Sequence, residues 1–326
     1  MTTSMAASHE APHKNHHGHN PDMRVVVAGI ELANPILAAS GTFGYGIEFE
    51  EVISLDRIGG FVTKGISREA MAGNAAPRLI ETSAGMINAI GLQNIGVEAF
   101  VRDKLPVLAP YRTAVIVNVF GYQVEDYVAV IRRLNEAEGI AAYEINASCP
   151  NTKHGGMAFG ADAAALAELV AHCRHYSRRP IIVKLSPNVT SISAMARCAE
   201  ASGADALSLV NTFVSMAIDI HTRQPRLSNV TGGLSGPAIK PIAVRMVWEA
   251  AQAVKIPILG LGGIASAEDA IEFLLAGATA VQVGTASYAD PRATENIANE
   301  LTHWCHKHHL ERVSELTGGL RLPTAP

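Results

Sequence analysis

The segment 145–156 carries the residue types that could perform catalysis. An apolar run over residues 141–145 stops at Asn146, and Cys149 follows three residues later, at the start of a polar loop with two glycines. This pattern is typical of a strand that ends in an active-site loop, where a rigid scaffold fixes the catalytic groups. An Asn amide can donate and accept hydrogen bonds, and a thiol can act as a nucleophile or carry a proton. On its own Cys149 is more often a small buried thiol, so the residues around it must decide between the two interpretations.

The elements that must position this loop alternate regularly along the chain. Short apolar runs alternate with helical patterns, which is typical of parallel strands joined by crossover helices. We predict eight such strands, at residues 36–39, 60–63, 115–119, 142–145, 181–185, 206–210, 258–261 and 280–283. Eight units in 326 residues predict an α/β fold of the (β/α)8 (TIM) barrel type, with an open doubly wound sheet as the alternative.

One short segment lies outside this predicted domain. Residues 1–22 form a His-rich leader that we expect to be a disordered polar tail, and residues 23–326 form a single barrel domain that opens with a hairpin over 24–32. Long insertions follow strands 2 and 6, and insertions of this length are usually functional. They span 65–110 and 213–237, and helices are predicted at 124–137, 162–176, 191–202, 238–254, after a capping Ser266, and at 293–308.

Polar residues stand at the ends of these apolar strands. Lys64 and Lys184 follow strands 2 and 5, and Asn118, Asn146 and Asn211 end or follow strands 3, 4 and 6. In a barrel they would surround one mouth, where buried lysines are costly unless they are paired or bound to a ligand. The only acidic residue near these strand ends is Glu144, so the sequence predicts an anionic ligand.

The last two strands end in glycine-rich turns. Gly262 and Gly263 follow strand 7, and Gly284 and Thr285 follow strand 8. Barrels bind phosphate at this place through backbone N–H groups, so these residues predict a phosphate-bearing cofactor. The GLGGI sequence at 260–264 lacks the full GxGxxG spacing, which argues against a dinucleotide-binding sheet.

The composition excludes several classes of function. The net charge of −4 gives no basic patch for nucleic acid. The four Cys form no CxxC pair, which argues against a zinc ribbon or an iron–sulfur cluster built from this chain alone. Sparse Cys, no secretory signal and no long uncharged apolar stretch predict a cytoplasmic protein.

Six motifs between residues 34 and 287 resemble, in order, those of the dihydroorotate dehydrogenases, which are FMN-containing barrels. They are MINAIGLQN at 86–94, NASCPNTKHGG at 146–156, VKLSPN at 183–188, VNT at 210–212, GLSGPA at 233–238 and GLGGI at 260–264. The resemblance implies oxidation of (S)-dihydroorotate to orotate in de novo pyrimidine (UMP) biosynthesis. Cys149 would take the C5 proton as general base, and FMN N5 would take the C6 hydride. Cys149, rather than a Ser, places the chain with the soluble members.

The resemblance also implies residue roles. Cys149, Lys64 and Lys184 would be catalytic. The substrate would contact Lys64, Asn88, Ala89, Ile90, Gly91, Leu92, Asn146, Asn211 and Thr212. FMN would contact Ser40, Lys64, Gly65, Asn118, Asn146, Lys184, Val210, Gly236, Gly262, Gly263, Gly284 and Thr285. No metal site is expected.

The loop at 153–160 resembles that of class 1B catalytic subunits. This implies that electrons pass to NAD through a separate subunit with FAD and a [2Fe–2S] cluster, in a homodimer or a heterotetramer with that subunit. The alternatives are a fumarate-dependent class 1A enzyme and another FMN barrel that acts on a dihydropyrimidine. A binding protein that holds its ligand without turnover is an alternative from a different functional class, which Cys149 and the two lysines disfavour. A metal site on the last helix is a further alternative. Its ligands would come in pairs, such as Cys305 and His309, and two ligands do not complete a metal site.

Overall fold

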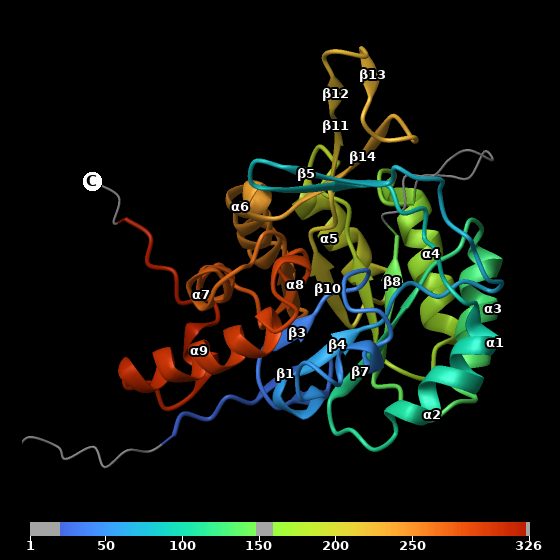
Figure 1. Cartoon of the computed structure of the whole chain (residues 1–326). Coiled ribbons are helices and arrows are strands. Elements are labelled where there is room, and N and C mark those ends of the chain that lie inside the picture. The colour runs from blue at the N-terminus through green and yellow to red at the C-terminus, as the bar shows by residue number, and fades with distance from the viewer. Residues whose placement is uncertain (1–19, 148–158, 324–326) are drawn as a thin grey trace, which may run out of the picture.

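A closed barrel of eight parallel strands forms the centre of the protein (Figure 1). The computed structural model describes residues 20–147 and 159–323. The barrel strands are β3 (Ile36–Ala38), β4 (Gly60–Val62), β7 (Ala114–Val119), β8 (Ala142–Asn146), β9 (Ile181–Lys184), β10 (Ala206–Leu209), β15 (Ile258–Leu261) and β16 (Ala280–Val283). They neighbour one another in chain order, and β16 pairs with β3 to close the ring. The predicted (β/α)8 barrel is confirmed, and each predicted strand lies within one residue of its position at either end.

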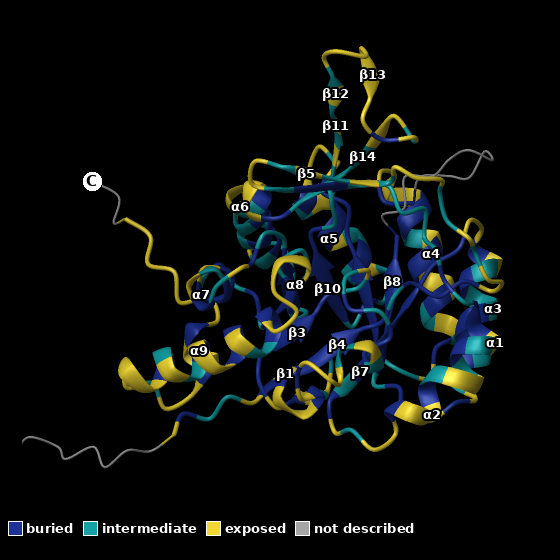
Figure 2. Ribbon diagram, in the orientation of Figure 1, coloured by how far each residue is buried: buried dark blue, intermediate teal, exposed yellow. Residues whose placement is uncertain are grey.

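The strands read as continuous apolar runs because both of their faces are covered. All residues of β8, β9 and β10 are buried, and the helices lie outside the ring of strands (Figure 2). The longer outer helices are α3 (Val124–Asn135), α4 (Ala163–Tyr176), α5 (Ile192–Ala201), α6 (Lys240–Ala251), α7 (Ala267–Leu275) and α9 (Ala293–Lys307). Ser266 caps α7 as predicted: its hydroxyl accepts from Asp269 N, and the Asp269 carboxylate accepts from Ser266 N.

The first strand–helix unit departs from the prediction of eight regular units. Between β3 and β4 the structure has only two 3-10 turns, η1 (Ile47–Phe49) and η2 (Leu55–Arg57), and no α-helix. The remaining short elements are α1 (Val97–Ala99), the π-helical η3 (Phe100–Lys104), α2 (Leu105–Leu108), η4 (Pro237–Ile239), α8 (Ala286–Ala289) and η5 (Val313–Leu316). No helix among the described residues has the length and apolar character needed to cross a membrane.

The two long insertions combine into one antiparallel sheet, which the sequence did not reveal. The first contributes β5 (Leu79–Thr82) and β6 (Gly85–Asn88), and the second contributes β11 (Phe213–Met216) and β14 (Thr231–Ser235). The sheet order is β11-β14-β6-β5, so β14 joins β6 across more than a hundred residues of chain. Beyond it a two-stranded arm, β12 (Ile218–Asp219) and β13 (Gln224–Pro225), projects away from the barrel (Figure 1).

The N-terminal hairpin is present as predicted. It pairs β1 (Val25–Val27) with β2 (Ile30–Leu32), and three of its side chains are buried in the main hydrophobic core. Asp22 forms a β-bridge with Arg312, so the fold begins at the edge of the predicted leader. Residues 1–19 of that leader lie outside the described residues.

Substitution of Gly85 tests whether the stability of the sheet formed by the two insertions depends on the close approach of its backbones. A Cβ at Gly85, where φ is 151°, would lie 2.0 Å from the carbonyl oxygen of Ser235 in β14. Gly29 also has a positive φ, 81°, but a Cβ there would meet nothing within 4 Å. We expect Gly85→Ala to lower the free energy of unfolding by about 1–3 kcal/mol more than Gly29→Ala, because only Gly85→Ala adds an overlap to the backbone strain. Urea titration and amide exchange of β6 and β14 measure this, and equal losses in the two variants would contradict it.

Candidate active site

A cavity of about 290 Å³ opens at the carboxyl ends of the barrel strands. Its lining comes from strand ends and from both insertions, which places the sheet β11-β14-β6-β5 beside the mouth. The structure brings together all but one of the predicted site residues that it describes. These are Ser40, Lys64, Gly65, Asn88, Ala89, Ile90, Gly91, Leu92, Asn118, Asn146, Lys184, Val210, Asn211, Thr212, Gly262, Gly263, Gly284 and Thr285.

Two predicted residues stand apart from this set. Gly236 is not in the lining; it lies directly behind it, with its carbonyl oxygen 2.7 Å from where a Cβ of Gly263 would be. Cys149, the predicted base, falls in the segment 148–158, outside the described residues. Asn146, the last residue of β8, lines the cavity and precedes Cys149 by three residues in the chain.

The glycines at one end of the cavity keep the backbone accessible. Gly263 has a φ of 83°, which favours glycine, and a Cβ there would also collide with the backbone of Gly236 and Lys240. Gly262 is similar, because a Cβ would lie 2.8 Å from that of Ala243. Backbone N–H groups exposed in this way can reach the oxygens of a phosphate.

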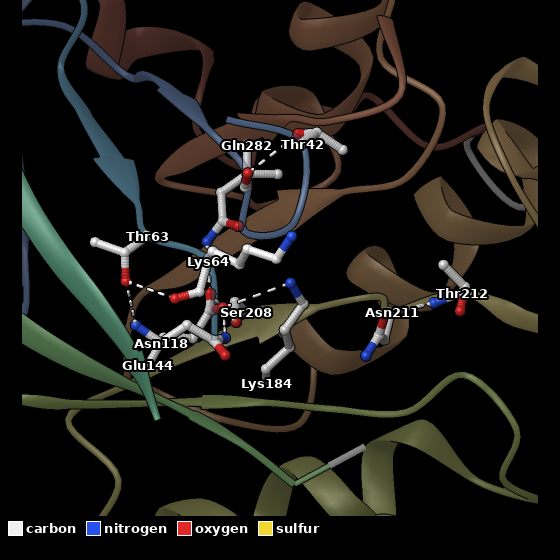
Figure 3. A network of polar contacts seen from close by, with 11 residues as sticks. Thr42, Thr63, Lys64, Asn118, Glu144, Lys184, Ser208, Asn211, Thr212 and Gln282 are labelled. Atoms are coloured by element: carbon white, nitrogen blue, oxygen red, sulfur yellow. Dashed lines mark hydrogen bonds and ion pairs between the residues drawn. The ribbon is translucent and has the colours of Figure 1, made fainter. Parts of the chain in front are cut away.

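A fully buried carboxylate, Glu144 of β8, lies within a network of polar side chains, several of which line the cavity (Figure 3). Glu144 Oε1 accepts from Asn118 Nδ2 at 2.7 Å and lies 3.4 Å from Lys184 Nζ. Its Oε2 accepts from Ser208 Oγ and from Gln282 Nε2, both at 2.9 Å. A buried charge is tolerated when it is paired and hydrogen-bonded. The network therefore explains how Glu144 and Lys184 can both lie inside the barrel.

The two lysines differ in their surroundings. Lys184 is 5% exposed and forms the ion pair with Glu144. Lys64 has no carboxylate within ion-pair distance among the described residues. Burial, reinforced by the positive charge of Arg78, lowers the pKa of Lys64, and the negative charge of Glu48 opposes this only in part. Lys64 is thus the cation at the cavity that most lacks an anion.

The turn after β6 is held by Asn74, which the sequence analysis missed. Asn74 Nδ2 donates to Ala89 O at 2.8 Å, and Asn74 N donates to Ile90 O at 2.9 Å. Gly91, at φ 76°, leaves room for the Asn74 side chain, which a Cβ would overlap at 2.6 Å. The turn therefore presents its backbone to the cavity in one fixed shape. Asn74 follows no predicted strand, and only its polarity within a long insertion could have marked it.

Several other lining residues were also missed, and three of them are polar side chains at or near the ends of the barrel strands. Gln282 lies inside β16 and Tyr288 in α8, and Thr42 follows β3. The Gln282 amide in an apolar strand was a signal of the same kind as the strand-end lysines. Thr42 lies in a turn and Tyr288 in the short helix α8, where a polar residue is unremarkable.

The donor set fits a phosphate-bearing, nitrogen-rich ring such as FMN. The glycines offer a backbone cradle at one end, and two lysines stand at the strand ends. Two buried side-chain oxygens, Asn118 Oδ1 and Gln282 Oε1, have no partner among the described residues. An unpaired buried acceptor costs about 1–3 kcal/mol, so a ligand with N–H groups would satisfy what the protein leaves unpaired.

The alternative of a metal site on α9 is not supported. Among residues 20–147 and 159–323 no three His, Cys, Asp or Glu side chains gather as a metal site. Cys305 is fully buried, and burial raises the pKa of its thiol to about 11, which disfavours the thiolate that binds metal.

The chain matches known proteins over most of its length. The sequence model described as "Dihydroorotate dehydrogenase" matches residues 22–304. A protein of Solibacter usitatus named "Putative dihydroorotate dehydrogenase A (fumarate)" is 58% identical, over 92% of this chain and 99% of that protein. Proteins of Pelobacter propionicus and Geobacter sp. (strain M21), each named "Dihydroorotate dehydrogenase B (NAD(+)), catalytic subunit", are each 54% identical over 92% and 93% of this chain and 99% of their own lengths. This chain belongs to the dihydroorotate dehydrogenase family.

Proposed function

We propose that the protein oxidises (S)-dihydroorotate to orotate with one FMN per chain, in pyrimidine biosynthesis. One observation carries the proposal: a single cavity is lined by two lysines and by the amides of Asn88, Asn146 and Asn211. Lys184 is paired with Glu144, whereas Lys64 has no carboxylate within ion-pair distance among the described residues. This set suits a small, flat, carboxylated ring beside a phosphate-bearing cofactor. Family membership supports the same reaction.

FMN, when bound, supplies the hydride acceptor for the substrate C6. Gly262, Gly263, Gly284 and Thr285 would hold its phosphate, with Gly236 behind them. Around the ring, contacts would come from Ser40, Lys64, Gly65, Asn118, Asn146, Lys184 and Val210. The ammonium group of Lys184, fixed by Glu144, would stabilise negative charge at the nearby flavin edge.

Other residues of the chain would act on the substrate. Cys149 would remove the C5 proton as general base. The Lys64 ammonium would bind the substrate carboxylate. The ring would be held by Asn88, Asn146, Asn211 and Thr212 together with the backbone of the turn at Ala89, Ile90, Gly91 and Leu92.

For the electron acceptor we propose NAD, reached through a partner subunit with FAD and a [2Fe–2S] cluster. Relatives named as class B catalytic subunits support this, as does the resemblance of the 153–160 loop. Fumarate is the second candidate, because the Solibacter usitatus relative carries that acceptor in its name. A homodimer would form the core of either assembly.

The half-reaction tests the substrate and the base. Anaerobic mixing of the FMN-loaded chain with dihydroorotate should bleach the flavin absorbance. Cys149→Ala should slow the bleaching by about 10²–10⁴-fold, the usual contribution of a general base. Cys198→Ala, which changes a thiol on α5 outside the cavity, is the matched control and should bleach at the wild-type rate. Bound flavin that dihydroorotate cannot bleach would reject this substrate.

The lowered pKa of Lys64 leads to a prediction about the pH dependence of orotate binding. A bound carboxylate raises the lowered pKa of Lys64, so the complex holds more protons than the free protein. The affinity is therefore greatest below the pKa of free Lys64 and falls as the pH rises through it, with a limit of about tenfold per pH unit. Titrations of orotate between neutral and alkaline pH should show this fall in wild type and a smaller one in Lys64→Arg, whose charge does not titrate there. Equal slopes in the two proteins would assign the pH dependence to another group.

The acceptor is tested separately with the same reduced protein. We expect fumarate to reoxidise the isolated chain slowly, and NAD to reoxidise it only when a co-purified or co-expressed flavin–iron–sulfur subunit is present. Stopped-flow recovery of flavin absorbance measures both rates. Rapid turnover of the isolated chain with fumarate would assign the protein to the fumarate-dependent class.

A further inference from the structure

Glu144 takes no part in the proposed reaction, yet it is the most heavily hydrogen-bonded carboxylate near the site. It has no exposed surface and does not line the cavity. Its four partners come from four different barrel strands, β7, β9, β10 and β16. A purely structural brace would need only donors, whereas two of these partners are amides that also carry an acceptor.

The carboxylate decides which way these two amides face. Asn118 and Gln282 both turn their NH2 groups to Glu144, at 2.7 and 2.9 Å. Reversing either amide would place a carbonyl oxygen against a carboxylate oxygen at about the same distance, which is repulsive. Each amide oxygen must therefore point elsewhere, and both residues line the cavity.

The outcome is a cavity floor with acceptors at fixed positions. Asn118 Oδ1 and Gln282 Oε1 are buried and have no partner among the described residues. Lys184, held by the same carboxylate, adds a donor to this floor. The pyrimidine edge of flavin offers one N3–H donor, which the two amide oxygens would share as acceptors, and Lys184 would face one of the two carbonyl oxygens that flank it.

We propose that Glu144 is a positioning residue that turns the carbonyl oxygens of Asn118 and Gln282 toward the flavin, so that the cavity floor selects the N3–H edge of the ring. Gln282 is thereby a further cofactor-contacting residue beside Asn118. The proposal rests on the proposed function, because it takes the bound ring to be that of FMN.

Binding of FMN and 3-methyl-FMN to the full chain, stripped of flavin, tests the inference. Methylation at N3 removes the donor and leaves the phosphate and the rest of the ring unchanged. Quenching of flavin fluorescence gives both dissociation constants without requiring turnover. Wild type should prefer FMN by roughly tenfold or more, as expected when a buried acceptor loses its donor.

The variants separate orientation from mere bracing. In Glu144→Gln the new amide can donate as well as accept, so Asn118 and Gln282 can turn over and the preference should fall to within about threefold. Ser208→Ala removes a donor to Glu144 but leaves both amides facing it, and should keep the wild-type preference. If Glu144→Gln does not fold, Asn118→Leu and Gln282→Met replace it, and at least one of them must lose the preference.

The outcomes are distinguishable. A Glu144→Gln protein that binds both flavins more weakly but with an unchanged ratio would show that Glu144 is only structural and would overturn the inference. Equal affinity of wild type for the two flavins, in a protein whose FMN dihydroorotate still bleaches, would overturn the inference alone. Failure of wild type to bind either flavin would overturn the proposed function and this inference with it.

Discussion

The site depends on one constraint, the presence of a negative charge inside the barrel. Glu144 is hidden from solvent, and such a charge is stable only if donors surround it. Removing one partner of a buried ion pair typically costs about 3–5 kcal/mol of stability. The ion pair with Lys184 therefore stabilises the Glu144 carboxylate and also fixes the position of the Lys184 ammonium group. Because the donors come from four other strands, the network also ties the strand ends together where the cavity opens.

The barrel and the insertions contribute different properties to the cavity. The strand ends supply charged and amide groups held by a rigid, fully packed ring. The sheet β11-β14-β6-β5 supplies mainly backbone, in the turn over residues 89–92 that Asn74 fastens by two hydrogen bonds. Side chains on rigid elements suit charge stabilisation, and a backbone edge suits recognition of a planar ring that offers donors and acceptors of its own.

The sequence predicts the barrel well because each strand carries its own signal. Apolar runs that end in Lys64, Asn118 or Lys184 are local patterns, and all three residues meet at the cavity. The antiparallel sheet of the two insertions was missed because β6 and β14 are far apart in the chain and neither is long or apolar enough to be recognised alone. The partners Ser208 and Gln282 were missed for a related reason, since only the closed ring shows that they face Glu144.

The names of the relatives give different electron acceptors, fumarate in one and NAD(+) in another. The two relatives are nevertheless similarly close to this chain, at 58% and 54% identity. Both names include dihydroorotate dehydrogenase, so in the proposed function the residues that line the cavity would serve the same half-reaction whichever acceptor follows. An acceptor subunit would have to approach the reduced cofactor from the surface of the chain, whereas a small acceptor such as fumarate could enter the cavity itself. The surface beyond the sheet of the two insertions offers apolar side chains for such an approach, because the projecting arm of β12 and β13 exposes Ile218 and the following Ile220.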